Sequence, residues 1–334
     1  MIPVPRTLTV TAIVLLAILY GISPVTGAVE RDLTTPYQEA LSKAAPGDQT
    51  NSTTGITGAD GWLFFGPELR HLNRPGGGTN ENARALSAIL DFHSQLKKAG
   101  IALLVVPVPA KASIYPEKLT TGLQPPSALP FVADSAFCAL LATNGVPTLD
   151  LTGIYFTNRV SSAPLYCRTD SHWSPEGVRI AASEIASRIR AEAEPAAGKI
   201  PMDTEQREIV IRGDLSSPAD SGETVTIHPV TSGGHTIPAS RESPVLLLGD
   251  SHNLVFHSGG EMHAEGAGLP DQLAKELGFP VDVVAVMGSG ATAARRSLAR
   301  RRDNLAGKRV VVWCFSARDL TEAPSWDKVS VIRP

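Results

Sequence analysis

Short apolar runs alternate with longer amphipathic stretches along most of this chain. The apolar runs have the length of strands that are buried on both faces of a sheet, and they span 101–106, 147–151, 245–248, 281–286 and 310–315. Apolar residues at helical spacing between these runs predict helices at 80–99, 133–143, 175–189, 270–277 and 291–305. This alternation predicts an α/β sandwich in which crossover helices join parallel strands.

Two segments depart from the alternating pattern. Residues 29–57 are polar and rich in Thr, Ser, Pro and Gly, which predicts a linker before a folded domain over 58–334. Residues 196–241 contain Pro, Gly and short β-branched runs at 209–211 and 224–227. We therefore expect a β-rich insertion there, which either shapes a substrate groove or caps the sheet.

The first 28 residues have the features of an export signal. Arg6 is their only basic residue, an apolar run covers 8–22, and small residues at 26–28 offer a cleavage site. The run is shorter than the roughly 20 residues of a membrane-spanning helix, but an uncleaved anchor is the alternative to a cleaved signal. Both alternatives predict a periplasmic or otherwise extracytoplasmic protein, with inner-membrane association in the second.

Composition narrows the range of functions. With 334 residues, 43% of them hydrophobic, the chain can bury an enzyme-sized core. Its net charge of −3 gives no electrostatic reason to expect a nucleic-acid partner, and we expect the arginines within 295–302 to form a solvated helix face. Among the three cysteines, Cys138 and Cys167 could pair and Cys314 fits a buried strand; none has the spacing of a zinc or redox motif.

The most informative residue is Ser251, because it follows the apolar run 245–248 through Gly249 and Asp250. Parallel-sheet enzymes carry nucleophiles at the carboxyl ends of strands. Asp170 and His172, two residues apart, supply the other side chains of a Ser-His-Asp triad, in which the imidazole is the base and the carboxylate orients it. Alone, each of these residues also has a structural interpretation, as a helix cap, a turn residue or a satisfied histidine.

Three further residues are candidates for binding the reacting group. The backbone N–H of Ser251 would be one donor to an oxyanion, and the loop that holds Gly288 and Gly290 could offer a second or could be only a turn. Arg168 could pair with a sugar carboxylate or with Asp170. The motif that contains Asp170 runs into a helix start, with Ser174 as N-cap.

A metal site is the rival interpretation of the same segments. Asp170 with His172 and Asp250 with His252 are matched pairs of metal-ligand types, so the two segments could enclose a divalent cation. That arrangement would leave Ser251 without a function. We therefore expect no metal and no cofactor, and we expect the remaining histidines to be surface residues: His228, His235, His257 and His263.

Several motifs in one order resemble the alginate O-acetyltransferase AlgJ/AlgX family. They span about residues 58–320 and comprise Asp60–Phe64, Val106–Lys111, Tyr115–Leu119, Arg168–Trp173 and Gly249–Ser251. The resemblance implies an SGNH-hydrolase-like three-layer sandwich with a mostly parallel sheet. It also implies that the acid and histidine come from the Asp-x-His-Trp motif and the nucleophile from the later serine, so that Asp170, His172 and Ser251 take these roles. The chain resembles shorter, AlgJ-type members that lack a carbohydrate-binding module.

The resemblance implies an O-acetyltransferase that modifies an exported polysaccharide through an acetyl-serine intermediate, beside a membrane acyltransferase partner that delivers acetyl groups. A carbohydrate esterase with the same triad is the first alternative, because water would replace the sugar as acceptor. A non-catalytic scaffold of a polysaccharide secretion complex is the second. Within the matched motifs we expect Lys111 to be a loop charge, and Tyr115 and Trp173 to be structural.

Overall fold

A computed structural model describes residues 34–47, 55–74, 79–160, 163–192 and 198–333. The segment expected to be a signal or anchor lies outside these residues. No helix within the described ranges combines the length and the apolar character needed to span a bilayer.

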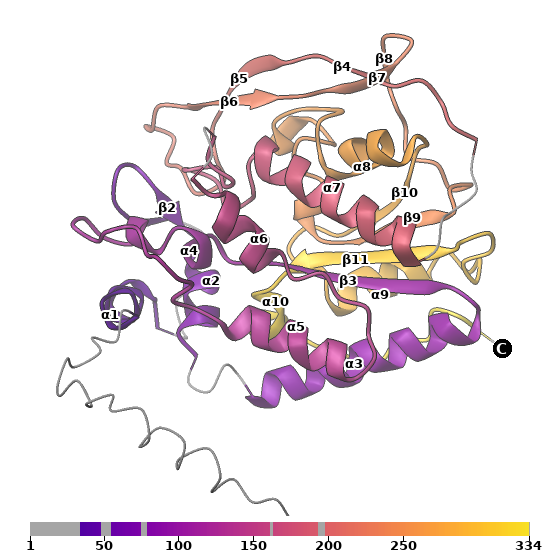
Figure 1. Ribbon diagram of the computed structural model, residues 1–334, viewed down its shortest axis with the longest axis horizontal. Helices are drawn as coiled ribbons and strands as arrows, with labels where there is room; N and C mark the ends of the chain where they lie inside the picture. Colours follow the sequence, from indigo (N-terminus) through magenta and orange to yellow (C-terminus); the bar gives the residue numbers. More distant parts are fainter. Residues whose placement is uncertain (1–33, 48–54, 75–78, 161–162, 193–197, 334) are drawn as a thin grey trace, which may run out of the picture. The chain divides into compact units, whose positions relative to one another are not determined.

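The centre of the fold is a four-stranded, wholly parallel sheet with the order β10-β9-β11-β3 (Figure 1). The strands are β3 (Ala102–Val108), β9 (Val245–Gly249), β10 (Asp282–Ala285) and β11 (Val310–Ser316). All four apolar runs behave as expected of strands that are covered on both faces. The fifth expected strand, at 147–151, is wrong: only an isolated bridge pairs Thr148 with Val105, and a helix begins at Leu151.

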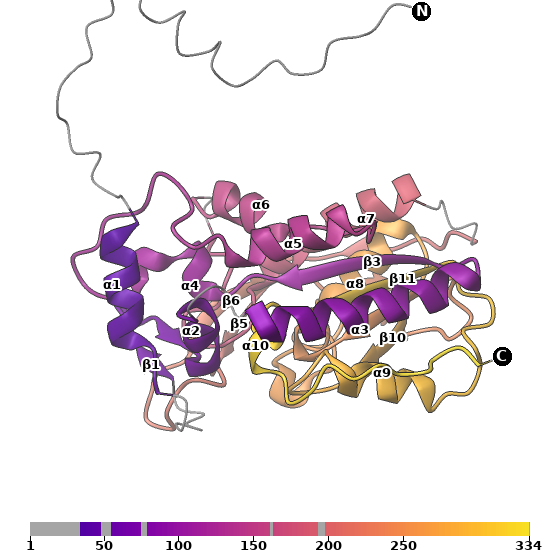
Figure 2. The same ribbon diagram turned by 90° about the horizontal axis from the view of Figure 1, so that it is seen from below.

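Helices cover both faces of this sheet, which makes three layers (Figure 2). One face packs against α3 (Thr79–Lys98) and α9 (Thr292–Ala299) through one apolar cluster, which side chains of α5 (Ala133–Thr143) also join. The other packs against α6 (Leu151–Asn158), α7 (Pro175–Glu192) and α8 (Leu269–Leu277) through a second. Alternate residues of β9 join the two clusters: Leu247 faces one, and Leu246 and Leu248 face the other. The predicted α/β sandwich is therefore confirmed.

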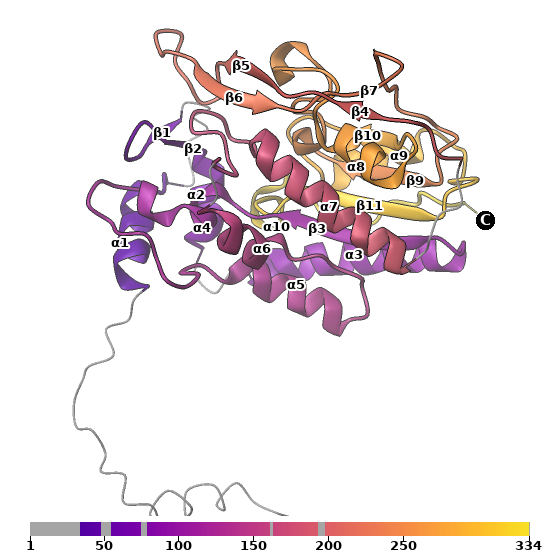
Figure 3. The same cartoon turned by 45° about the horizontal axis from the view of Figure 1, so that its top comes forward.

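The segment expected to be an insertion is rich in strands, as predicted. It contains β4 (Asp203–Thr204), β5 (Arg207–Ile211), β6 (Glu223–Ile227), β7 (Val230–Ser232) and β8 (His235–Thr236). Strands β5 and β6 form an antiparallel hairpin. The insertion lies over α7 and α8 on the outside of the sandwich (Figure 3). Its position beside α7 brings it close to the residues that precede this helix.

The described part of the expected linker is more ordered than its composition suggested. It contains α1 (Thr35–Ala44), and Tyr37, Ala40 and Leu41 of this helix join the apolar core. Residues Ile56–Thr57 form β1, which pairs with β2 (Leu63–Phe64). The linker interpretation is therefore wrong for these residues, because a few apolar side chains in a polar segment are enough to anchor a short helix.

Short helices complete the chain between these elements. They are α2 (Gly66–Leu72), α4 (Lys111–Ile114) and α10 (Asp319–Glu322), with 3-10 turns η3 (Pro116–Lys118), η4 (Ser251–Asn253) and η5 (Gly260–Met262). Because the sheet is parallel, the segments after β3, β9, β10 and β11 all leave from the same edge. The η4 turn begins at that edge with Ser251.

Candidate active site

The three predicted triad residues meet at the carboxyl edge of the sheet. His172 Nε2 lies 2.8 Å from the Ser251 hydroxyl, and His172 Nδ1 lies 2.6 Å from Asp170 Oδ1. All three residues are buried, and Ser251 is 7% exposed. Because the carboxylate accepts the Nδ1 proton, the lone pair of Nε2 faces the serine, which is the arrangement that a general base requires.

The surroundings of the triad set its charge states. Burial alone would lower the pKa of His172, but the hydrogen bond that His172 donates to Asp170 and the charges of Asp170, Asp214 and Asp250 outweigh it and raise this pKa. Burial alone would raise the pKa of Asp170, but hydrogen bonds from His172 and His263 hold it well below its usual range. Asp170 is therefore an anion at neutral pH, and the imidazolium formed when His172 accepts a proton is stabilised.

A buried lysine holds the backbone of the segment that carries Asp170. Lys111 is not exposed, and its ammonium group donates to the backbone carbonyls of Asp170 at 2.5 Å and of Leu63 at 2.8 Å. Burial lowers the pKa of Lys111, while the charges of Glu68 and Asp170 oppose this shift. The expectation of a loop charge is therefore wrong, because Lys111 is an internal support of the loop that carries Asp170 and His172.

The loop between β5 and β6 holds the same segment through further hydrogen bonds. The Asp214 N–H donates to Asp170 Oδ2 at 3.0 Å, and the Asp214 carboxylate accepts from the backbone N–H and the hydroxyl of Ser171. A Cβ atom at Gly213 would lie 2.1 Å from the Thr169 carbonyl oxygen, so only glycine permits this approach. The insertion is thus part of the site that orients the acid.

A second histidine also contacts the acid. His263 Nε2 lies 2.8 Å from Asp170 Oδ2, and its side chain is only 10% exposed. It follows η5 with a positive φ of 70°, and its ring packs against Phe256, which also has a positive φ. Strained backbone of this kind is commonly retained at functional sites. The expectation that His263 is a surface residue is wrong.

The metal interpretation does not fit the observed arrangement of its four residues. Asp250 accepts from His252 Nδ1 at 3.1 Å and from the backbone N–H groups of His252 and Ser316, so its carboxylate is used inside the fold. Within the described ranges, the acidic and imidazole groups close enough to share an ion are those of Asp170, His172 and Asp214. Asp250 and His252 are not among them, and the Asp170 oxygens already accept hydrogen bonds from two imidazoles.

A cavity of about 570 Å³ opens in front of Ser251. Its walls come from seven separate stretches of the chain, and its lining includes Arg212, Met262, Met287, Gly288 and Arg318. The Arg318 guanidinium lies over the Phe65 ring, 5.1 Å from its centroid, and donates to Ser316 Oγ at 2.9 Å. A fixed cation in this cavity suits a developing negative charge on an acyl oxygen.

The two glycines considered as oxyanion donors differ. Gly288 lines the cavity, with a positive φ of 84°. The Gly290 N–H instead donates to Asp319 Oδ2 at 2.8 Å, and a Cβ atom at Gly290 would lie 2.4 Å from the Phe315 Cβ. Gly290 as an oxyanion donor is therefore contradicted, because its N–H is already used and its small size serves strand packing. Gly288 stays a prediction.

Arg168 lies outside the cavity in front of Ser251. It lines a neighbouring cavity, where its Nε lies 3.8 Å from Glu223 Oε1.

The predicted N-cap is confirmed: Ser174 Oγ accepts from the Gly177 N–H at 3.2 Å at the start of α7.

The two aromatic residues of the matched motifs are structural, as expected. Trp173 is buried, and its Nε1 donates to the His252 carbonyl at 3.1 Å, which ties the segment of His172 to the segment of Ser251. The Tyr115 hydroxyl accepts from the Leu165 N–H at 2.9 Å. Burial raises the pKa of Tyr115 to about 12.

Two expectations outside the site need correction. All three cysteines are free and buried, so Cys138 and Cys167 are not paired. In the arginine segment, Arg295 is not exposed: it stacks on Trp313 and Trp326, and burial lowers its pKa to about 10. Arg301 pairs with Asp282 at 2.6 Å. The segment is therefore only partly a solvated helix face.

Sequence reasoning also missed residues that line or support the site. Arg318 lies two residues after the end of β11, and the rule that parallel strands end at one edge could have placed it near Ser251. His263 and Asp214 lie in irregular loops that carry no periodic signal. Only the three-dimensional arrangement brings them to Asp170.

A buried Ser-His-Asp triad at the carboxyl edge of a parallel three-layer sandwich defines the class as an SGNH-hydrolase-like domain. Comparison with known proteins agrees: the family model described as SGNH hydrolase-like domain, acetyltransferase AlgX, matches residues 56–317. The chain belongs to this family.

Two relatives are similar to part of this chain. A probable alginate O-acetylase AlgJ of Pseudomonas fluorescens is 26% identical over 221 residues, which are 59% of this chain and 53% of that protein. The protein of the same name in Pseudomonas aeruginosa is 33% identical over 135 residues, 40% of this chain and 33% of that protein. The chain thus spans about half the length of the first relative and a third of the second.

Among solved structures, the O-acetyltransferase domain of Pseudomonas putida AlgJ superposes with a TM-score of 0.65 at 22% identity, covering 80% of this chain and 93% of that one. AlgX of Pseudomonas aeruginosa gives a TM-score of 0.61 at 19% identity, with coverage of 85% and 69%. These similarities establish the fold.

Proposed function

We propose that this protein is a serine-dependent O-acetyltransferase that acetylates an exported polysaccharide through an acetyl-serine intermediate. The observation that carries the proposal is the continuous chain of contacts from Asp170 through His172 to the Ser251 hydroxyl, at 2.6 and 2.8 Å. Membership of a family described by its acetyltransferase supports the class of reaction. The names of the relatives, alginate O-acetylases, support a polysaccharide of the alginate type as substrate.

In the first half-reaction His172 Nε2 takes the proton of the Ser251 hydroxyl while the oxygen attacks the acetyl carbonyl of the donor. The acetyl oxygen becomes an oxyanion, which faces the Arg318 side of the cavity and the Ser251 N–H. When the tetrahedral intermediate collapses, the bond to the leaving group breaks and His172 returns the proton to that group. Acetyl-Ser251 remains, and Asp170 stabilises the imidazolium throughout.

In the second half-reaction a sugar hydroxyl takes the place of the leaving group. His172 removes its proton, the sugar oxygen attacks the acetyl carbon, and Ser251 leaves with the proton from His172. The protein's own contribution is to hold this hydroxyl in line and to keep water from the acetyl-serine. We further propose a periplasmic location and a membrane acyltransferase partner that delivers acetyl groups, with the N-terminal segment as signal or anchor.

The test is intact-mass spectrometry of the protein and its Ser251→Ala variant after brief incubation with p-nitrophenyl acetate, followed by mannuronate oligomers. An added acetyl group that requires Ser251 and then passes to the oligomer supports the transferase. Loss of the acetyl group to water at the same rate with and without oligomer would indicate an esterase. An unmodified protein with intact ester would contradict both enzymes and favour a scaffold.

A further inference from the structure

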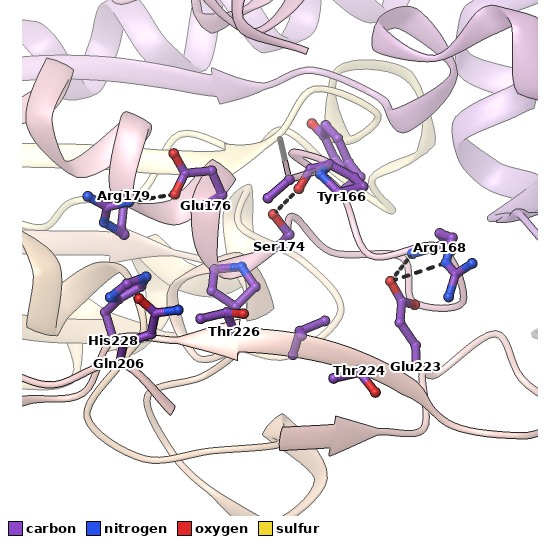
Figure 4. A pocket seen from close by; sticks show the side chains of 14 residues that line it. Tyr166, Arg168, Ser174, Glu176, Arg179, Gln206, Glu223, Thr224, Thr226 and His228 are labelled. Carbon is purple, nitrogen blue, oxygen red and sulfur yellow. Dashed lines mark hydrogen bonds and ion pairs between the residues drawn. The ribbon is translucent and has the colours of Figure 1, made fainter. Parts of the chain in front are cut away.

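A second cavity, of about 650 Å³, lies beside the catalytic loop and takes no part in the chemistry described above. Its walls are residues 163–168, the first turn of α7 and the strand β6, so we call it the hairpin cavity (Figure 4). Its volume falls within the range of about 300–1,000 Å³ that is usual for small-molecule sites. It shares none of its lining residues with the cavity in front of Ser251.

The hairpin cavity and the catalytic cavity are separated by residues 168–170. On the hairpin side, Glu223 Oε1 accepts from the Arg168 N–H at 2.9 Å, and Glu223 Oε2 accepts from the Thr169 N–H and hydroxyl at 3.0 and 3.1 Å. On the other side, Gly213 and Asp214 lie against Thr169 and Asp170. One hairpin, β5–β6, therefore contributes to both cavities. Only residues 168–170 separate a polysaccharide bound in one cavity from the other cavity.

The groups that the hairpin cavity offers to a ligand are mainly donors. Arg168 and Arg179 lie apart, at its two ends (Figure 4), and their side chains are 48% and 46% exposed. Both oxygens of the buried Glu223 are already occupied by the loop, and Glu176 engages Arg179 through Nη1, one of several donor groups on that guanidinium. Both acids therefore serve to hold backbone and side chains in place.

Neutral polar groups lie between the two arginines. Thr224 and Thr226 project from β6, and Gln206 and His228 stand near Arg179 (Figure 4). Burial and the neighbouring charge of Arg179 lower the pKa of His228, so its imidazole is neutral at pH 7 and can both donate and accept. Hydroxyl, amide and imidazole groups between two guanidinium groups match the hydroxyls and carboxylates of an acidic sugar.

We propose that the hairpin cavity binds a carboxylate-bearing sugar unit of the acceptor polysaccharide, a neighbour of the unit that is acetylated at Ser251. This inference rests on the proposed function, which supplies the polysaccharide. Binding remote from the reacting atoms would hold the acceptor hydroxyl at acetyl-Ser251 and favour it over water.

The first experiment measures binding alone, by isothermal titration of the full chain with a mannuronate hexamer in the absence of any acetyl donor. Arg168→Gln and Arg179→Gln are compared with Arg188→Gln, a matched control on the exposed side of α7 that lines neither cavity. Each of the first two substitutions is expected to raise Kd about tenfold, the usual cost of one charge-assisted hydrogen bond. The control is expected to leave Kd unchanged, and added salt should weaken binding to the unsubstituted protein.

The second experiment repeats the titration with a neutral glucose hexamer. Equal affinity for the two hexamers, lost equally in both variants, would overturn the assignment of a carboxylate. Absence of hexamer binding, or a Kd that changes no more in Arg168→Gln and Arg179→Gln than in Arg188→Gln, would overturn the site itself.

Formation of acetyl-Ser251 from p-nitrophenyl acetate separates this inference from the proposed function. We expect Arg179→Gln to form the acetyl-enzyme at the rate of the unsubstituted protein while its KM for the hexamer as acceptor rises. Normal acetyl-enzyme with an unchanged acceptor KM would contradict the hairpin cavity alone. Failure of the unsubstituted protein to form acetyl-Ser251 would contradict the proposed function, and the titrations would still decide whether the cavity binds acidic sugars.

Discussion

The tripeptide Asp-Ser-His occurs at 170–172 and again at 250–252, and the two copies contribute different side chains to one site. In both copies the histidine N–H donates to the Asp Oδ1 at 2.9 Å, and the imidazole Nδ1 lies within hydrogen-bond distance of the same oxygen. The first copy supplies its acid and base to the triad. The second supplies its serine.

Position in the fold explains this difference. The first copy leads into α7, where His172 Nε2 points across to Ser251. The second copy leaves β9, where Asp250 is fully buried and accepts from the N–H of Ser316 at the end of β11. Burial lowers the pKa of His252, whereas the hydrogen bond to Asp170 and the nearby carboxylates raise the pKa of His172. The same local hydrogen-bond pattern thus acquires different chemistry from what surrounds it.

The largest expected effect concerns the two serines. Ser251→Ala removes the nucleophile, and we expect acetyl-enzyme turnover to fall by about 10⁶-fold, as in other serine triads. Ser171→Ala removes only a hydroxyl that donates to Asp214 at 2.6 Å, so its turnover should stay within about threefold of the unsubstituted protein. Stopped-flow hydrolysis of p-nitrophenyl acetate measures both. Similar losses in the two variants would contradict the assignment of the nucleophile.

The two acids should differ in the quantity that they affect. Asp170→Asn removes the acceptor of the Nδ1 proton and favours the wrong tautomer of His172, so kcat should fall by about 10⁴-fold in a domain that stays folded. Asp250→Asn disturbs buried hydrogen bonds and should lower the free energy of unfolding by about 1–3 kcal/mol. Urea titration and kinetics on both variants decide whether the two effects separate in this way.

The pH dependence of acylation follows from the raised pKa of His172. Only the neutral imidazole can accept the serine proton, so the rate should rise with pH, by about tenfold per unit, until it levels above a pKa higher than the usual 6.5. A rate profile from pH 5 to 9 gives this midpoint. In Asp170→Asn the midpoint of the residual activity should move down, because the carboxylate no longer favours the charged imidazole. A midpoint that does not move would exclude Asp170 as the cause.

The smallest expected effect concerns His263, which has no counterpart contact in the second tripeptide among the described residues. His263→Leu removes a donor to Asp170 Oδ2, and we expect kcat to fall about tenfold. His263→Gln retains an N–H donor and should recover most of this loss. Equal activities of the two variants would show that the histidine only fills space.

The fold was predictable from the chain because its strands are buried on both faces and its helices are amphipathic. The runs that became β3, β9, β10 and β11 were recognised by length and composition. The run at 147–151 failed because a short apolar segment has no periodicity that separates a strand from a helix start. Helix α1 was missed because its core contacts, through residues such as Leu41, come from the tertiary fold.

The triad was predictable because each of its segments lies where a strand or loop leads into a helix. The residues that support the triad were less predictable. Lys111, Asp214 and His263 approach Asp170 from three unconnected parts of the chain, and no spacing in the sequence links them. The hydrogen bond from the Gly290 N–H to Asp319 was likewise not predictable, because the sequence around a loop glycine does not indicate whether its N–H has a partner.

The central claim is that Ser251 of the second Asp-Ser-His tripeptide carries the acyl group, and that Asp170 and His172 of the first tripeptide activate this serine. The most direct measurement is tandem mass spectrometry of peptides from protein quenched in acid seconds after mixing with p-nitrophenyl acetate. We predict an acetyl group on the peptide that contains Ser251 and none on the peptide that contains Ser171, with the modification absent from His172→Ala. Acetylation at Ser171, or at Ser251 to the same extent without His172, would contradict the account.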